Sequence, residues 1–236
     1  MCTVSFVYTQ GKMIITSNRD EKVIRPAALQ PKYYAVQQKS VWYPKDPQGG
    51  GTWFAVDTHS TVIVLLNGAI AQHKTKPSYR KSRGMILLEL IGNESPIQAW
   101  EAIDLEDIEP FTLVLLQHHY LYQLQWDGTF KITTPLDTSQ AYIWSSVTLY
   151  PPPIQKQREA WFSAFLDTQP EVDAHELFHF HRYTEASNTT NGLVINREER
   201  YKTVSITQAV IDQNKITLKY ADLIAAHEYA HNFIAI

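Results

Sequence analysis

The chain has 236 residues, of which 44% are hydrophobic and 19% charged, and its formal net charge is −3. These values predict a globular chain, expected as a single domain over residues 1–236, and argue against nucleic acid or an anionic membrane as the main partner. The single cysteine excludes an internal disulfide and favours a reducing compartment. Without an apolar run of ~18 residues or a signal-peptide pattern, we expect a cytoplasmic protein with no membrane insertion.

Residues 2–21 predict a β-hairpin. Thr3–Thr9 and Lys12–Ser17 are rich in β-branched and aromatic residues, and Gln10-Gly11 between them is a short turn signal. If those two residues form the loop, the numbers of every facing pair sum to 21. A bulge at Gly11 would shift this register by one residue.

In that register Cys2 lies opposite Arg19, and Met1 lies opposite Asp20. Opposed side chains on one face have Cβ atoms roughly 4.5–5.5 Å apart. The face that carries Cys2 and Arg19 is the more apolar of the two, so we expect it to pack inward with these residues at its open end.

The remaining elements are predicted from periodicity and turn residues. Residues 22–51 are expected to be mostly irregular because prolines interrupt them and a glycine run ends them, with short strands at Tyr33–Val36 and Val41–Tyr43. Further strands are predicted at Thr52–Asp57, Thr61–Leu66, Phe111–Gln117, Tyr120–Trp126, Thr129–Thr133, Tyr142–Ser145, Gly192–Asn196, Thr203–Ile211 and Ile216–Tyr220. Helices are predicted from Ser82 or Arg83 to Ile91, and at Ile97–Ile103, Ile154–Leu166 and Val172–His181. Alternating blocks of strands and helix pairs are typical of α+β layers.

The position of Cys2 directly after Met1 suggests a catalytic role. Removal of Met1 would leave Cys2 with both a thiol and a free α-amine, whose reference pKa of about 7.7–8.0 suits a base for its own side chain. Arg19 would favour the thiolate, and Asp20 would orient the amine. The alternative is that Cys2 is an ordinary small apolar residue and that the charged residues after Asn18 form a solvated turn.

Two H-E-x-x-H matches suggest a zinc site, at His175–His179 and His227–His231, with Glu199 as a possible third ligand to the first. On a helix this spacing places both imidazoles on one face. The first copy is followed by a polar stretch and a predicted strand, not by a second ligand-bearing helix, and the second has five residues after it. We therefore expect no metal at either copy.

At Met1-Cys2 and Asn18-Arg19-Asp20-Glu21 the chain resembles the NRDE family, also called the transport and Golgi organisation family. This family looks like a branch of the N-terminal-nucleophile hydrolases. The resemblance runs nearly end to end. It is carried by Met1-Cys2, Asn18-Arg19-Asp20-Glu21, Arg25-Pro26, Gly50-Gly51-Thr52-Trp53, Asn67 at a strand end, Trp144-Ser145-Ser146, and Arg200 ahead of Thr203-Val204-Ser205-Ile206.

The resemblance implies an α+β fold, a four-layer αββα sandwich with two stacked, mainly antiparallel sheets. It also implies relatedness to choloylglycine hydrolases and penicillin V acylases, which cleave non-peptide C–N amide bonds. By this resemblance the site residues are the nucleophile and base Cys2, its supports Arg19 and Asp20, the oxyanion-hole candidate Asn67, and the late supporting cation Arg200.

One position departs from the family pattern. Many relatives have an Asn oxyanion donor where this chain has Ser146. Losing one such donor can cost about 10²–10³ in rate, so turnover is expected to be slow unless Ser146 or a backbone N–H substitutes.

The sequence therefore supports two functions. The first is an amidohydrolase for N-acyl amides that needs no metal or organic cofactor, with Trp42, Trp53 and Trp144 either lining an apolar acyl pocket or packing in the core. The second is a carrier on the same fold, because the resemblance extends to eukaryotic relatives discussed in connection with lipid, acyl-CoA and haem handling. A carrier would keep the pocket without needing the α-amine.

Overall fold

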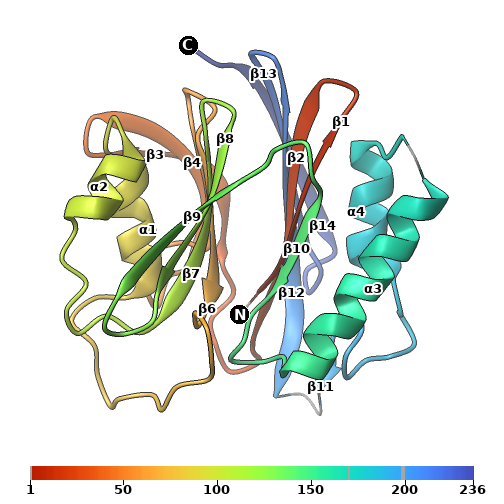
Figure 1. Cartoon of the computed structure of the whole chain (residues 1–236), viewed down its shortest axis with the longest axis horizontal. Helices are drawn as coiled ribbons and strands as arrows, with labels where there is room; N and C mark the ends of the chain where they lie inside the picture. The colour runs from red at the N-terminus through yellow and green to blue at the C-terminus, as the bar shows by residue number, and fades with distance from the viewer. Residues whose placement is uncertain (1, 170, 198–199) are drawn as a thin grey trace. The chain divides into compact units, whose positions relative to one another are not determined.

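The computed structural model describes residues 2–169, 171–197 and 200–236. The chain forms two compact units. The first contains the residues up to Arg25 together with Ser139–Ile234, and the second contains Pro26–Thr138 with Ala235–Ile236. Each unit combines one antiparallel sheet with a pair of helices (Figure 1).

The sheet of the first unit, called sheet A, has the strand order β10-β1-β2-β12-β13-β14, with β11 pairing with β12 off this path. Its strands are β1 (Cys2–Thr9), β2 (Lys12–Lys22), β10 (Tyr142–Ser145), β11 (Asn196–Arg197), β12 (Tyr201–Asp212), β13 (Lys215–Asp222) and β14 (His227–Ile234). Helices α3 (Pro152–Thr168) and α4 (Ala174–Tyr183) pack on one face of this sheet (Figure 1).

The sheet of the second unit, called sheet B, follows the chain from strand to strand. Its strands are β3 (Leu29–Val36), β4 (Lys39–Lys45), β5 (Phe54–Asp57), β6 (Val62–Asn67), β7 (Phe111–Gln117), β8 (Tyr120–Trp126) and β9 (Lys131–Leu136). Helix α1 (Arg83–Ile91) begins after the N-cap Ser82, and α2 (Pro96–Ala102) begins after the N-cap Ser95, as expected from proline in its first turn.

The β1–β2 hairpin has the predicted register. The facing pairs run from Cys2 and Arg19 to Thr9 and Lys12, so the expected two-residue turn is confirmed. The expectation of one inward face was incomplete, because both faces are buried over most of the hairpin. Val7 and Ile14, on the face opposite to Cys2, pack in a core cluster with the helix residues Phe162 of α3 and Leu177 and Phe180 of α4.

The structure corrects three sequence predictions. Residues 22–51 are not mostly irregular, because β3 and β4 form a hairpin whose turn includes Gln37 at φ 53°. Gly192–Asn196 is largely loop, and the short strand there is Asn196–Arg197. A final strand, β14, occupies a stretch for which no strand was predicted.

Helix length bears on the expectation of no membrane insertion. The 17-residue α3 contains charged residues on both its exposed and its buried side, with Arg158 buried. Within the described ranges, no helix has both the length and the apolar character that a bilayer span requires.

Candidate active site

Strand alternation in sheet A brings Cys2 and Arg19 onto the face opposite to α3 and α4. Arg19 pairs with Cys2 on one side and with Ser205 of β12 on the other. At the open end of the hairpin, the backbone N–H of Ser146 donates to the carbonyl oxygen of Cys2 over 3.0 Å. Cys2, Arg19 and Ser146 are therefore neighbours across three segments of one unit.

The Cys2 thiol is free and only 1% exposed. Burial raises its pKa, and the carboxylate of Asp20 acts in the same direction. The Arg19 guanidinium and the Ser17 hydroxyl oppose this by lowering the thiol pKa. The predicted effect of Arg19 on the thiolate is present, but desolvation outweighs it.

Arg19 is itself held by a carboxylate. Its Nη2 lies 3.3 Å from Oε2 of Glu21, and the same oxygen lies 3.7 Å from Nε of Arg25. Glu21 is two residues beyond Arg19 in β2, so the two side chains share a face. The NRDE motif thus supplies the cation beside Cys2 together with the anion that orients this cation.

Asp20 points to the helix-covered face, away from the thiol. Its carboxylate accepts hydrogen bonds from the Tyr150 hydroxyl at 2.5 Å and the Thr203 hydroxyl at 2.6 Å. Burial raises the pKa of Asp20, whereas the Arg158 guanidinium and the two hydroxyl donors lower it. Arg158 is fully buried and lies 3.6 Å from the Tyr150 ring centroid. Asp20 is therefore the centre of a buried polar cluster beside the first residues of β1.

Asn18 belongs to the same face and joins the hairpin to α4. Its amide donates to the carbonyl oxygens of His181 and Leu193 at 2.9 and 2.7 Å. His181 contacts the Asn18 oxygen through Nδ1 and Ser5 Oγ through Nε2, each at 2.7 Å. Burial lowers the pKa of His181 to about 3, with Arg158 adding to the effect. The ring is therefore neutral, Nδ1 carries the proton, and Ser5 donates to Nε2.

The remaining predicted site residues are distributed over both units. Trp144 of β10 pairs with Val4, so it shares the face of Cys2, while the Ser146 hydroxyl lies 3.0 Å from that of Thr148. Arg200 is exposed in a turn, where its carbonyl accepts from the Val23 N–H. Residues of the second unit are the half-buried Asn67 at the end of β6 and the buried Trp42 and Trp53.

The two H-E-x-x-H copies have different structures. The first lies on α4, where Glu176 completes a capping box with Asp173 and where His175 and His179 are exposed. The helical interpretation of the second is wrong, because His227–His231 lies within β14. Glu199 lies outside the described residues. Within those residues no three potential ligands cluster as a metal site.

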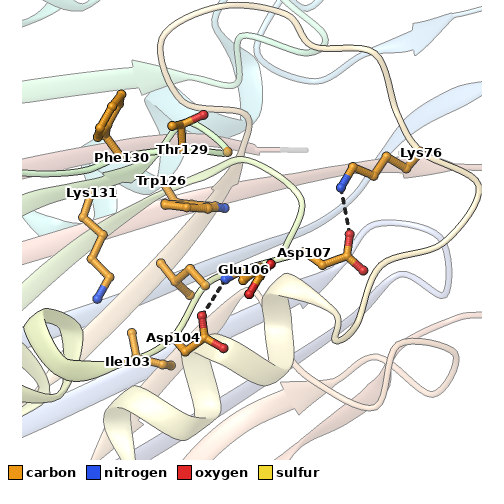
Figure 2. Close-up of a pocket in the computed structure, with 11 residues that line it drawn as sticks. Lys76, Ile103, Asp104, Glu106, Asp107, Trp126, Thr129, Phe130 and Lys131 are labelled. Carbon is orange, nitrogen blue, oxygen red and sulfur yellow. Dashed lines mark hydrogen bonds and ion pairs between the residues drawn. The ribbon is translucent and has the colours of Figure 1, made fainter.

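A pocket of about 630 Å³ lies in the second unit, between the 103–107 segment and the β8–β9 hairpin. Figure 2 shows the Lys76 ammonium directed at the Asp107 carboxylate, a contact of 2.8 Å, and the Asp104 carboxylate accepting from the backbone N–H of Glu106. Trp126, Phe130 and Lys131 contribute to its wall. The predicted site residues do not line this pocket.

Several contributors to the Cys2 environment were not predicted. Ser17 shares the face of Cys2 and Arg19, but its role was not considered. Ser205 and Thr207 approach through the pairing of β12 with β2, which local patterns do not specify. The alternation of hydroxyl residues along 203–207 was the available signal.

A family model described as Transport and Golgi organisation 2 matches residues 1–223. The chain belongs to the Transport and Golgi organisation 2 family. The family resemblance of the Cys2 and Asn-Arg-Asp-Glu motifs is therefore confirmed. Comparison of the sequence with curated proteins finds no match.

Solved structures show the fold of this family member. The C2A mutant of a conjugated bile acid hydrolase from Clostridium perfringens matches with a TM-score of 0.65 and 9% identity, covering 99% of this chain and 92% of that one. A second variant of that hydrolase, with one arginine replaced by leucine, matches with a TM-score of 0.60 and 10% identity, covering 98% of this chain and 92% of that one. The N-acylethanolamine-hydrolyzing acid amidase orthologue of Caenorhabditis elegans matches with a TM-score of 0.61 and 10% identity, covering 88% of this chain and 92% of that one. The prediction of an α+β fold of the N-terminal-nucleophile hydrolase type is confirmed by these likenesses.

Proposed function

We propose that this family member is a cysteine amidohydrolase for N-acyl amides, with Cys2 as nucleophile after removal of Met1. The observation that carries the proposal is the pairing of Cys2 with Arg19 in a fold shared with hydrolases. One similar structure is an amidase for N-acylethanolamines, which are N-acyl amides. This likeness supports an amide as the bond that is cleaved. It does not specify the acyl group or the amine of the substrate.

The reaction would proceed through a thioester. The freed α-amine accepts the thiol proton while the sulfur attacks the amide carbonyl carbon, and Arg19 stabilises the anionic sulfur. The C–N bond then breaks as the ammonium returns its proton to the leaving amine. Water, deprotonated by the same α-amine, attacks the thioester and releases the carboxylic acid and the free thiol. Asp20 and its cluster hold the backbone that carries the amine.

Oxyanion stabilisation is the weak part of this site. The Ser146 N–H already donates to the Cys2 carbonyl, so it is not available to an oxyanion. Within the first unit, the hydroxyl of Ser146 is the side-chain donor proposed for this role. With Ser146 in place of an asparagine, we expect slow turnover.

The test uses the mature chain and a panel of N-acyl amides that varies in acyl length and amine. Intact mass establishes whether Met1 is removed, and product amine is then quantified. We expect turnover by the processed chain and none by Cys2→Ala. The matched control is a chain with one blocking residue ahead of Cys2, which keeps the thiol but lacks the α-amine. Equal turnover by blocked and processed chains would overturn the proposed mechanism.

The burial and raised pKa of the Cys2 thiol favour a second function, a carrier of acyl-CoA, lipid or haem. A carrier would bind its ligand without turnover. Titration of palmitoyl-CoA and haem against wild type and Cys2→Ala separates the two functions. Equal, tight binding by both proteins, with no amide product from wild type, would favour the carrier.

A further inference from the structure

Three hydroxyl groups on the Cys2 face of sheet A are buried without a hydrogen-bond partner among the described residues. They belong to Ser17, Ser205 and Thr207, each 0% exposed. Buried hydroxyl groups in folded proteins are normally hydrogen-bonded, so three together require an explanation. Their partners would have to come from the space that this face of the sheet borders.

The register places the three hydroxyls next to the thiol. Ser17 pairs with Thr207, and Ser205 pairs with Arg19, which in turn pairs with Cys2. Ser17 is thus the diagonal neighbour of Cys2 on the adjacent strand, within roughly 7–8 Å between Cα atoms. Its hydroxyl is close enough to the sulfur to favour the charged form of the thiol.

The charge of the thiol decides what these hydroxyls can do. A neutral thiol is a weak acceptor, and in that state the three donors remain unsatisfied. A thiolate is a strong acceptor, and hydrogen bonds to a charged group are roughly twice as strong as neutral ones. Ser17 and Thr207 have no competing acceptor among the described residues and therefore favour the ionised sulfur, whereas Ser205 also acts on the Tyr220 hydroxyl.

We propose that Ser17 donates a hydrogen bond to the Cys2 thiolate, and that Thr207 and Ser205 extend this contact into a row of hydroxyls that replaces water around the buried sulfur. The proposal rests on the proposed function, in which the thiolate is the nucleophile. Ser17 is then a positioning residue beside the nucleophile. The hydroxyl row supplies the hydrogen bonds that water would make to an exposed thiolate.

Other charged and titratable groups of the first unit act on the same sulfur and must be kept constant. Arg19 favours the thiolate and Asp20 opposes it. Across the sheet, Tyr220 pairs with Thr207 and Asp222 pairs with Ser205. Burial raises the pKa of Tyr220 to about 12, although the Ser205 hydroxyl lowers it, so this tyrosine stays neutral up to pH 10. None of these groups is altered in the test, so a change in the ionisation of Cys2 reports the hydroxyl row.

The test exploits the single cysteine of the chain. Labelling with cysteine enriched in ¹³C at Cβ, in the chain with one blocking residue ahead of Cys2, gives one signal whose shift follows ionisation of the thiol between pH 6 and pH 10 without that of the α-amine. We expect Ser17→Ala to lower the ionisation constant by about tenfold and Thr207→Val to lower it by less, since a hydrogen bond to a charge is lost. The matched control is Ser5→Ala, a buried serine of the same hairpin that faces away from Cys2 and binds His181.

Stability gives a second readout that a merely structural serine would not match. Ser17→Ala removes an unsatisfied hydroxyl, so its urea midpoint should equal or exceed that of wild type, whereas Ser5→Ala should lower it. An unchanged ionisation constant in Ser17→Ala overturns the proposal, as does a wild-type signal that stays at the thiol position up to pH 10. If Ser17→Ala does not fold, Thr207→Val decides by the same criteria.

The titration does not depend on turnover. A chain that hydrolyses no amide but shows the Ser17 effect would refute the proposed function and leave the hydroxyl row in place. A chain that turns over amides without the Ser17 effect would do the reverse.

Discussion

The hydroxyl of Tyr150 and the carboxylate of Asp20 meet at 2.5 Å, although they are 130 residues apart in the chain. This contact fixes the segment after β10 to β2, directly beside the first residues of β1. Thr203 and Arg158 complete the surroundings of the same carboxylate. The aspartate of the NRDE motif is thereby held from three separate segments.

Tyr150→Phe tests the strength of this contact. It removes one donor from a buried carboxylate, so the pKa of Asp20 should rise further and the free energy of unfolding should fall by about 1.5–3 kcal/mol. Urea unfolding at pH 7 measures the change. Tyr183→Phe, at a half-exposed tyrosine of α4, is the control and should have little effect. An equal loss in both variants would contradict the assigned role.

Asp20→Asn tests the direction of the Asp20 pKa. Because burial raises this pKa above its ordinary value of 3.8, the folded state binds more protons than the unfolded state above that pH. The contribution of Asp20 to stability is complete below pH 3.8 and is lost as the pH rises through the folded pKa. We expect wild type to lose stability relative to Asp20→Asn as the pH rises above 3.8. A stability difference independent of pH would show that the carboxyl group is not perturbed.

His181→Gln tests a dependence of the opposite sign. The pKa of His181 falls from 6.5 to about 3, so the unfolded state binds more protons between these values. Relative to His181→Gln, wild type should lose about 1.4 kcal/mol for each pH unit below 6.5. Urea unfolding at pH 5 and pH 7 compares them. The exposed His175 on the same helix provides the control, His175→Gln, which should retain the wild-type slope.

Gly51→Ala tests a close approach in the second unit. A Cβ at Gly51 would lie 2.2 Å from the carbonyl carbon of Gly84, so the strand entry and the start of α1 would have to separate. We expect a loss of about 3 kcal/mol or more in the free energy of unfolding. Gly11→Asn is the matched control, since a Cβ there meets nothing within 4 Å and asparagine tolerates its positive φ of 77°. A Gly51→Ala protein as stable as this control would contradict the packing argument.

Local patterns were sufficient for the hairpin that carries Cys2. A two-residue turn and strand alternation determined which side chains face one another, and the structure has the same pairs. The Tyr142–Ser145 strand was also predicted with the observed bounds, and the first helix was predicted to begin at Ser82 or Arg83 and end at Ile91, as observed for Arg83–Ile91. The catalytic roles given to Cys2, Arg19 and Asn67 stay predictions.

Long-range pairing explains what the sequence did not reveal. The β3–β4 turn includes Gln37 at positive φ, and glutamine gives no turn signal. The polar strand β14 is paired to β13 along its length, and its histidines suggested a helical metal motif instead. Alternation places Asp20 on the face opposite to Arg19, but the helices that cover this face and its partners Tyr150 and Thr203 come from distant segments.

The two-residue turn at Gln10-Gly11 has a consequence for how this hairpin can change in length. Residues of β1 alternate between a face with the thiol and a face bound to α4, and the facing residues of β2 alternate with them. Inserting one residue between Cys2 and the turn would exchange the two faces for the residues that precede the insertion. The sulfur would then lie under the helices, and the β1 side chains that hydrogen-bond to α4 would lie on the other face of the sheet. Natural length variation in this segment should therefore occur in steps of two residues, with an odd step tolerated only where a bulge restores the alternation.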